Sequence, residues 1–370
     1  MAQALGPLFG GIEGGATHST VALMNTDGHI YGPYVIDKST NHWTIGRETC
    51  YQNVLEMVQF AKQQCGCPIE TPLRGLCLSL SGMEDVREQN KLIEALKQRD
   101  PHLSESYNVC NDSMGALVTA SATGGLVLIA GTGSMCRLVT IEGSKDRHYR
   151  CGGWGHMIGD EGSAYYIAHK AVRMLYHAAD GILPRIEGAT PEAVQASLAY
   201  LRAKMCEFYK LADPSDILPH LYANFAKANF AGFAAKVAEG ADEGDLCCRQ
   251  IFQKAGRWLG MHIRAALGNL SPAQRATLTE HPVEIVCVGS VWKSWAHIRA
   301  GFMAALTEEH PADGGLVVPA PALRTPYRLV ELTMTAAVGA ALISAGQAAV
   351  SIPVDRSRYV RVLFDSAASA

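Results

Sequence analysis

Short apolar runs alternate with longer segments of helical periodicity along this chain. The first pattern predicts strands and the second predicts amphipathic helices. Up to residue 120, strands are predicted at STVALMN, HIYGPYVI, 76–81 and 107–111, and helices at 46–64, 84–99 and from Asp112 onward. Such an alternation is typical of α/β proteins.

The rest of the chain continues this alternation around a mainly helical stretch. That stretch covers 162–268, with looser segments at 179–190 and 214–219. Beyond it, strands are predicted at 283–288 and 327–330, and helices at 291–308 and 333–348. The tail after Ser351 carries no clear pattern.

The order of elements at the amino terminus recurs once. FGGIEGGATHSTVALMNTDGHIYG and LVLIAGTGSMCRLVTIEGSKDRHYR each predict strand, glycine turn, strand, turn and strand. Two related halves would place their glycine turns on opposite walls of one cleft. We therefore expect a small α/β domain at 1–122 and a larger α/β domain at 123–370 that carries a helical insertion.

Composition narrows the range of partners and compartments. The chain has 370 residues, 48% of them hydrophobic, which is enough for a substantial core. Its net charge of -3 offers no general attraction for nucleic acid or an anionic membrane. No apolar run reaches the length of a membrane span, and MAQALGPLFG lacks the features of a secretory signal. We expect no nucleic-acid or membrane partner.

The 11 cysteines predict free thiols rather than disulfides or a metal site. They are scattered through apolar contexts such as LCLSL and VCVGS, which suits a reducing compartment. The pairs at 65 and 67 and at 247 and 248 lack the spacing of a zinc site. A cytoplasmic location is therefore expected.

The two glycine turns, GIEGGATHS at 11–19 and IAGTGS at 129–134, are the first candidates for binding chemistry. Backbone N–H groups in such turns can point at phosphate oxygens, and Thr and Ser hydroxyls add donors without bulk. Either turn alone is more often a simple hairpin, but the pair predicts a clamp for a triphosphate. The chain lacks the P-loop and the dinucleotide fingerprint, so phosphate would be held in another way.

Asp112 follows a predicted strand and begins a predicted helix in NDSMG. Its structural role would be to cap that helix. Its functional role would be to accept the proton of a hydroxyl that attacks a γ-phosphate. We favour the functional role, and both could coexist.

Two further segments carry candidate binding residues. CGGWGHMIGDEGSAYY at 151–166 combines five glycines, a Trp and two carboxylates, which is typical of a sugar pocket; the alternative is a loop in which Asp160 caps the next helix. CVGSVWKSW at 287–295 places small donors at a helix start and suits the nucleoside end of a nucleotide. In TNHW at 40–43, Asn41 could bind a hydroxyl, while Trp43 is expected to pack.

Taken in order, GIEGGATHS, STNHW, LSLSG, IAGTGS, CGGWGHMIGDEGSAY and CVGSVWKSW resemble motifs of the actin-like ATPase superfamily of sugar kinases, specifically the animal N-acetylglucosamine kinases. The resemblance runs over about residues 8–348. It implies a two-domain α/β fold of the actin-like ATPase (ribonuclease H-like) type with a cleft between the domains. It also implies ATP-dependent phosphorylation of the 6-hydroxyl of N-acetylglucosamine, and a homodimer is expected.

The same resemblance assigns roles to individual residues. The sugar would contact Asn41, Asp112, Ser134, Met135, Gly153, Trp154, Gly155 and Asp160, with Asp112 as the general base. The nucleotide would contact Thr17, Thr132, Gly133, Ala231, Gly289, Ser290 and Ser294. Glu13, where the superfamily has Asp, would reach Mg²⁺ through water.

Two residues depart from the family pattern. Ala16 replaces a usual third glycine, and Met135 replaces a residue that is commonly polar.

An actin-like or chaperone-like ATPase switch is the main alternative function, but it leaves the glycine and Trp segment unexplained. A sugar-responsive DNA-binding regulator would need a helix-turn-helix before the first turn, and a dehydratase activator would need cluster-binding cysteines.

Overall fold

The computed structural model describes residues 5–15, 18–142, 145–278, 282–307, 318, 323 and 325–368. The chain forms two compact units. The first unit comprises 1–127, 284–286 and 327–370, and the second comprises 128–283 and 287–326. The first unit therefore joins both ends of the chain, whereas the sequence predicts a single boundary near residue 122.

The first sheet has five strands in the order β3-β2-β1-β4-β5. They are β1 (Leu8–Gly14), β2 (Ser19–Asn25), β3 (Ile30–Ile36), β4 (Gly75–Leu80) and β5 (Tyr107–Asn111). The first three form an antiparallel meander, while β1, β4 and β5 run parallel. The predicted strands and the glycine turn between β1 and β2 are confirmed.

The second sheet has six strands in the order β11-β10-β9-β6-β7-β8. They are β6 (Gly124–Ala130), β7 (Ser134–Glu142), β8 (Lys145–Gly152), β9 (Val283–Val288), β10 (Tyr327–Leu332) and β11 (Val360–Asp365). The order β8-β7-β6-β9-β10 repeats the order β3-β2-β1-β4-β5. The sequence repeat predicts the correspondence of β6, β7 and β8 with β1, β2 and β3. The sequence missed β11, which pairs antiparallel with β10.

The helices follow most of the predicted segments. The first unit contains α1 (His42–Ile45), α2 (Arg47–Cys65), α3 (Val86–Arg99), α4 (Asp112–Ala120), α13 (Ala336–Gln347) and the 3-10 helix η3 (Arg356–Tyr359). The second unit contains α5 (Ala164–Ala179), α6 (Pro191–Tyr209), η1 (Pro214–Ile217), α7 (Leu218–Leu221), α8 (Lys227–Gly232), α9 (Ala234–Glu243), α10 (Leu246–Gly268), α11 (Pro272–Leu278), η2 (Ser290–Ser294) and α12 (Trp295–Thr307). The stretch 214–219, expected to be loose, is therefore helical.

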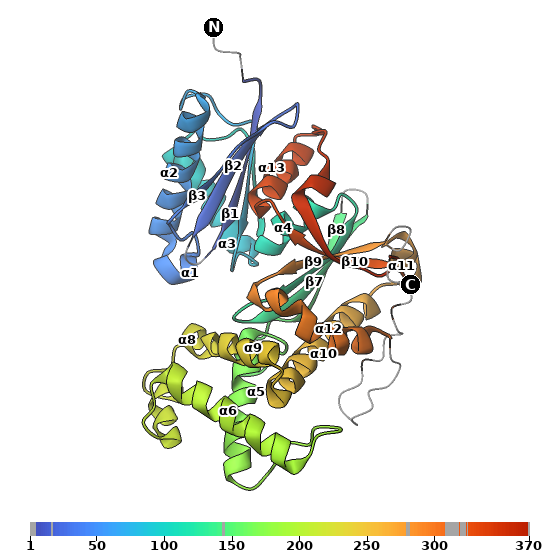
Figure 1. Cartoon of the computed structure of the whole chain (residues 1–370). Coiled ribbons are helices and arrows are strands. Elements are labelled where there is room, and N and C mark those ends of the chain that lie inside the picture. The colour runs from blue at the N-terminus through green and yellow to red at the C-terminus, as the bar shows by residue number, and fades with distance from the viewer. Residues whose placement is uncertain are drawn as a thin grey trace. The chain divides into compact units, whose positions relative to one another are not determined.

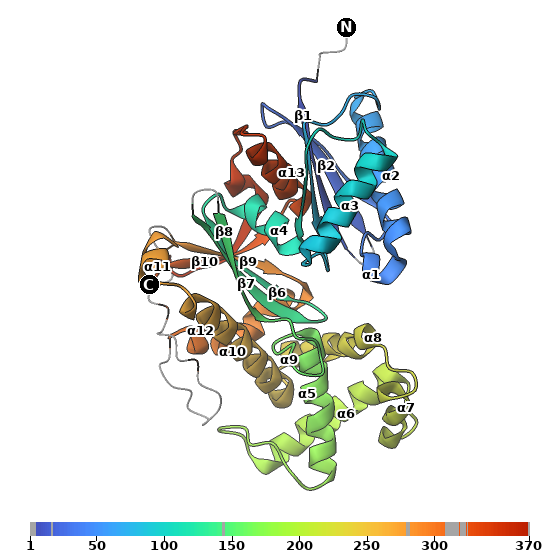
Figure 2. The ribbon, with the colours of Figure 1, turned by 180° about the vertical axis from the view of Figure 1, so that it is seen from behind.

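Side chains that alternate along β1 and β2 build two cores on the two faces of the first sheet. Leu8 and Ile12 pack with α2 and α3, whereas Phe9 packs with α13. Figure 1 shows α13, in red, beside the blue strands of this sheet, and Figure 2 shows α2 and α3 over its other face. The sheet is thus the middle layer of an α/β/α arrangement in the first unit.

Glycines allow α13 to approach β1 and α4 closely. A Cβ at Gly11 would overlap the backbone of α13 at Ala337, and a Cβ at Gly339 would overlap the carbonyl oxygen of Gly115 in α4. Thr119 joins the two helices, because its Oγ1 accepts from the Gly339 N–H at 2.9 Å and donates to Gly115 O at 2.8 Å. These small residues position α4, and with it Asp112.

In the second unit, α10 and α12 pack through glycines in the same way. A Cβ at Gly260 would lie 2.6 Å from Phe302 O, and Cβ atoms at Gly256 or Gly301 would overlap the backbone of the other helix.

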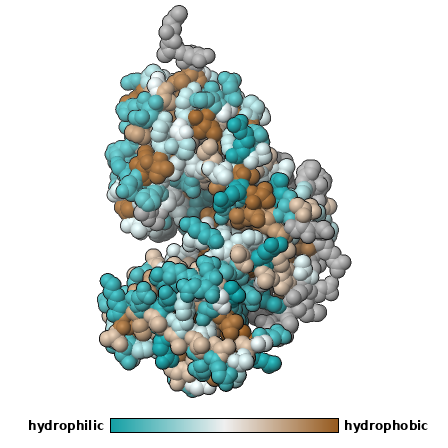
Figure 3. Space-filling model, in the orientation of Figure 1, coloured by the Kyte–Doolittle hydropathy of each residue, from teal (hydrophilic) through white to brown (hydrophobic). Residues whose placement is uncertain are grey.

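Within the described residues, no helix is both long and apolar enough to cross a membrane. Figure 3 shows hydrophobic residues in scattered groups among hydrophilic ones on the visible face.

Candidate functional site

The first half of the candidate site lies at one edge of the first sheet. Gly14 pairs with Leu80, and Leu80 pairs with Asn111, across the parallel strands β1, β4 and β5. The carboxyl ends of these strands therefore align, which is where open α/β sheets place their ligands. The residues that follow, Gly15, Ser81 and Asp112, consequently belong to the same edge.

Two loops form backbone hydrogen bonds with the first glycine turn. Ser81 N–H donates to Gly14 O at 2.9 Å, and Thr40 N–H donates to Gly15 O at 3.2 Å. A side chain at Gly14 would overlap the Thr40 hydroxyl, so only glycine fits there. Thr17 and Ala16, the predicted phosphate contact and the departure beside it, lie outside the described residues.

Asn41 and Trp43 lie beside this turn, and Trp43 corrects one expectation. Asn41 caps α1, with its Oδ1 accepting from Trp43 N at 3.0 Å. Trp43 was expected to pack, but its side chain is 70% exposed and its indole N–H donates to Gly82 O at 3.1 Å. The indole lies at the surface next to Asn41 because α1 is a single turn at the sheet edge.

Asp112 does not cap α4, which corrects the structural role that its position suggested. Asn111 is the N-cap, and its Oδ1 accepts from Ser113 N at 3.1 Å. Asp112 is instead the first residue of the helix and is partly buried. A carboxylate in the first turn is stabilised by the helix dipole.

Glu13 lies at the end of β1 and contacts the start of α13. Its Oε2 accepts from Ala336 N at 2.9 Å and from the Thr335 hydroxyl. Among the described residues, no group of three His, Cys, Asp or Glu side chains could hold a metal ion. Mg²⁺ usually keeps several waters and takes only one or two carboxylates besides phosphates, so the other Glu13 oxygen fits an ion held mainly by a nucleotide.

Asp160 organises the second half of the candidate site. Its side chain is 4% exposed; Oδ1 accepts from Ser134 N at 3.1 Å, and Oδ2 accepts from Lys227 Nζ at 2.7 Å. A Cβ at Gly133 would lie 2.7 Å from Oδ1, so a glycine is needed there. The carboxylate thus holds the second glycine turn in place.

The backbone of Asp160 is also unusual, and the alternative role that its position suggested, that of a helix cap, is wrong. Its φ of 64° lies in the left-handed region, which non-glycine residues rarely adopt. Ser163 is the N-cap of α5 and accepts from Tyr166 N at 3.1 Å. Burial and the Asp160 carboxylate raise the pKa of Tyr165, so the phenol stays neutral.

Of the residues predicted to contact the nucleoside, Gly289 lies directly against the second glycine turn. A Cβ at Gly289 would overlap Ala130 O, which places the end of β9 against the second glycine turn. Ser290 follows and is exposed, and Ser294 ends η2. Ala231 lies in α8, four residues after Lys227, and is 3% exposed.

The glycine and Trp segment adds an aromatic wall. Gly152, Gly153 and Gly155 all have φ between 75° and 82°, a conformation that favours glycine. Trp154 is 61% exposed, and the Arg150 guanidinium lies 4.0 Å from its ring centroid.

Two other predicted residues of the second half lie beside these features. A Cβ at Gly153 would come 3.0 Å from Met135 Cγ, so Met135 lies directly against this segment. Thr132 is exposed at the tip of the second glycine turn, and its carbonyl accepts from Tyr165 N at 3.4 Å. The second half of the site is therefore contiguous within its unit.

Sequence reasoning missed two contributors. Lys227, the partner of Asp160, comes from a helix 67 residues farther along the chain. Thr335, which donates to Glu13, lies 322 residues away. The only local signals were the charged start of KANFAG and the Thr before an Ala-rich helix, and neither is specific.

Comparison with known proteins places these features in a family. The family model of the BadF/BadG/BcrA/BcrD ATPases matches residues 11–313. The chain is 26% identical over 268 residues to an N-acetylmuramic acid/N-acetylglucosamine kinase from Clostridium acetobutylicum, covering 70% of this chain and 79% of that protein. It is 28% identical to an N-acetyl-D-glucosamine kinase from Dictyostelium discoideum over 48% of this chain and 57% of that protein.

A solved structure shows the same fold. A candidate N-acetylglucosamine kinase from Chromobacterium violaceum superposes with a TM-score of 0.61 at 21% identity. The match covers 91% of this chain and 99% of that one. The predicted fold class, a mixed α/β fold with two sheets of related strand order, is confirmed.

Proposed function

The chain belongs to the BadF/BadG/BcrA/BcrD ATPase family, and from this premise we propose that it is an ATP-dependent N-acetylglucosamine kinase. The product would be N-acetylglucosamine 6-phosphate, formed in the salvage of amino sugars. The two curated relatives, both sugar kinases by name, support this acceptor class over an ATPase switch without an acceptor.

One observation carries the proposal within the structure. Asp112 is placed at the carboxyl edge of the first sheet but does not cap its helix, because Asn111 fills that role. A carboxylate at such an edge is suited to accept a proton from a bound hydroxyl.

The proposed chemistry is a direct transfer. As the 6-hydroxyl oxygen attacks the γ-phosphorus, Asp112 accepts the hydroxyl proton, and ADP leaves with the electrons of the broken P–O bond. Backbone N–H groups of the turns at 14–15 and 131–134 would bind phosphate oxygens. Asn41 and the segment 153–155 would orient the sugar, with Trp154 against its ring.

The proposed kinase would bind magnesium together with ATP. When bound, it would neutralise charge on the β- and γ-phosphates. Glu13 would hold it through water, using Oε1, the oxygen that does not accept from Thr335 and Ala336. Because Oε2 is already engaged by Ala336 N–H, Glu13 is fixed in orientation before any ion binds.

The function is tested by coupled measurement of ADP release with glucose, N-acetylglucosamine and N-acetylmannosamine as acceptors. We expect N-acetylglucosamine to stimulate release strongly, with equimolar formation of its 6-phosphate by mass spectrometry. Release of ADP that no sugar stimulates would instead support the switch alternative.

Asp112→Asn is predicted to fold normally and to lose about 10²–10⁴-fold in kcat, because the amide cannot accept the proton. Glu94→Gln on α3, which also removes one carboxylate, is the matched control and should keep full activity. Circular dichroism and steady-state kinetics would check both variants. Near-wild-type turnover in Asp112→Asn would exclude Asp112 as the base.

A cytoplasmic location and a homodimer are further parts of the proposal. All 11 cysteines are free thiols, which suits a reducing compartment. Light scattering coupled to size-exclusion chromatography would test the dimer, and fractionation of cells that express the protein would test its location.

A further inference from the structure

A small hollow in the second unit is not part of the candidate site. It lies between α5, the segment that follows α5, and α10, and its volume is about 210 Å³. Its floor is apolar, and its rim is cationic. Its apolar side chains include Met174, Pro184 and Ile251, and its cationic side chains include Lys170, Arg173 and Lys254. We call this feature the cationic hollow.

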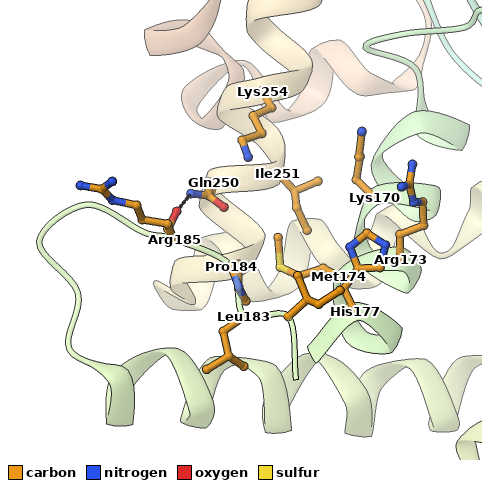
Figure 4. A pocket seen from close by; sticks show the side chains of 11 residues that line it. Lys170, Arg173, Met174, His177, Leu183, Pro184, Arg185, Gln250, Ile251 and Lys254 are labelled. Carbon is orange, nitrogen blue, oxygen red and sulfur yellow. Dashed lines mark hydrogen bonds between the residues drawn. The ribbon is translucent and has the colours of Figure 1, made fainter. Parts of the chain in front are cut away.

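The cations of the cationic hollow come from two helices. Figure 4 shows Lys170 and Arg173 on α5 at one side and Lys254 on α10 at the other, with Met174 and Ile251 between them. Residues 170, 173 and 174 share one face of α5, as helical spacing requires. Two packed helices therefore fix the spacing of the backbone positions that carry these cations.

These cations lack ion-pair partners among the described residues. In the part of the chain that the structure describes, none of Lys170, Arg173 and Lys254 forms an ion pair with a carboxylate. Burial lowers the pKa of Lys170, and Arg173 and Lys254 lower it further, while Glu161 alone opposes them. An anion bound between the helices would relieve this repulsion.

The cationic hollow is separate from the second glycine turn, although α5 connects the two. The first helical N–H of α5, from Ala164, donates to Gly131 O at 2.8 Å. Lys170 comes six residues later, which corresponds to roughly 9 Å along the helix axis. A ligand in the hollow would therefore not be the phosphate that the turn is expected to hold.

We propose that the cationic hollow binds a small phosphomonoester, with the phosphate between Lys170, Arg173 and Lys254 and the organic part on the apolar floor. A phosphomonoester carries close to two negative charges at neutral pH, which matches a three-cation rim better than a monocarboxylate does. The Arg173 guanidinium can bind two phosphate oxygens at once. The volume fits one small molecule, and the apolar floor gives preference to esters over inorganic phosphate.

The test is calorimetric titration of the full-length protein with phenyl phosphate, in the presence of AMPPNP and magnesium to occupy the nucleotide site. We expect saturable binding, weaker binding of inorganic phosphate and none of benzyl alcohol. Lys254→Gln should weaken phenyl phosphate binding roughly tenfold or more, because a hydrogen bond to a charged group is lost. Lys254 is exposed, so the variant should fold normally.

Lys97→Gln, which removes one exposed positive charge from α3, is the matched control and should bind as the wild type does. Lys170→Gln provides a second variant on the other helix and should show a loss similar to that of Lys254→Gln. Equal affinities in the wild type and both hollow variants would overturn the proposal. Absence of saturable binding up to about 10 mM phenyl phosphate would also overturn it.

Discussion

At the residue scale, the pair of Asp160 and Lys227 explains how a strained backbone position can persist. Asp160 has φ of 64° and is almost fully buried, and each of its carboxylate oxygens has a hydrogen-bond partner. Unusual conformations of this kind persist only where the surroundings determine them, and they are concentrated at functional sites. Asp160 therefore links the second glycine turn to α8.

Lys227→Met is predicted to destabilise the protein by roughly 1–3 kcal/mol, because it leaves a buried carboxylate with one donor fewer. Lys236→Met removes the lysine of a pair whose carboxylate, Glu239, is 45% exposed, against 4% for Asp160, and should cost less than about 1 kcal/mol. Urea unfolding of both variants would measure the difference. Equal costs would mean that the pair with the buried carboxylate contributes no more than the pair with the more exposed one.

His262 gives a prediction about pH. It is 6% exposed beneath Gly152, and burial lowers its pKa to about 4. Since the folded pKa lies below the unfolded value of about 6.5, protonation favours the unfolded state. Stability contributed by neutral His262 is therefore present above about pH 6.5 and is lost as pH falls toward 4, by about 3 kcal/mol in all.

His262→Phe, whose ring cannot be protonated, isolates this effect from the other titrating groups. The free energy of unfolding, measured between about pH 7 and 4, should fall less steeply in the variant than in the wild type. Parallel pH profiles would show that His262 does not contribute to acid sensitivity.

Short motifs allowed many candidate residues to be predicted, but not their partners. The two glycine turns and Asp160 stand out because their residue types are rare at such density. Lys227 could not be predicted, since its pairing depends on how α8 packs in the second unit. Trp43 was misjudged because hydrophobicity alone does not distinguish an aromatic residue in a core from one at an open edge.

At the element scale, α13 depends on glycines for its position. A Cβ at Gly339 would overlap Gly115 O, whereas a Cβ at Gly346 in the same helix would meet no atom within 4 Å. The two positions share a helix but differ in their packing. Together they separate the effect of close approach from the effect of helix propensity.

Gly339→Ala is predicted to destabilise the protein by roughly 1–3 kcal/mol or more, because the helices must move apart. Gly346→Ala should stabilise it by about 0.5–1 kcal/mol, since alanine is the better helix former. Thermal or urea unfolding would measure both changes. Destabilisation by both substitutions would argue against the packing explanation.

Most elements were predictable because their signals are local. Hydrophobic periodicity located α2, α3 and β4 to within one or two residues. β11 was missed because it forms only by pairing with β10, about 30 residues earlier in the chain. The helical turn at 214–217 was missed although Asp213 and Asp216 form a capping box there.

At the scale of the whole molecule, the first unit is built from both ends of the chain. Phe9, Ala22 and Met24 share one core with Ala337 and Ala341 of α13. A chain that ends at residue 326 would therefore expose that core and the backbone of β1 that Gly11 presents to α13. The second unit would lose none of its residues.

We predict that this truncation abolishes cooperative unfolding of the first unit, because an apolar face of its sheet is left uncovered. Hydrogen exchange measured by mass spectrometry should show rapid exchange in β1 and β2 and continued protection in α10. Protection of β1 and β2 equal to that in the full chain would contradict the prediction.

The contribution of α13 to the core beside β1 also sets an order for biosynthesis. The ribosome makes β1 first and α13 more than 300 residues later. The residues of the second unit lie between 128 and 326, so that unit is complete before α13 is made. Until then, the face of β1 that α13 covers stays exposed. During that interval the nascent amino-terminal sheet is a natural client for chaperones. Slowing translation should therefore lengthen its exposure rather than help it fold.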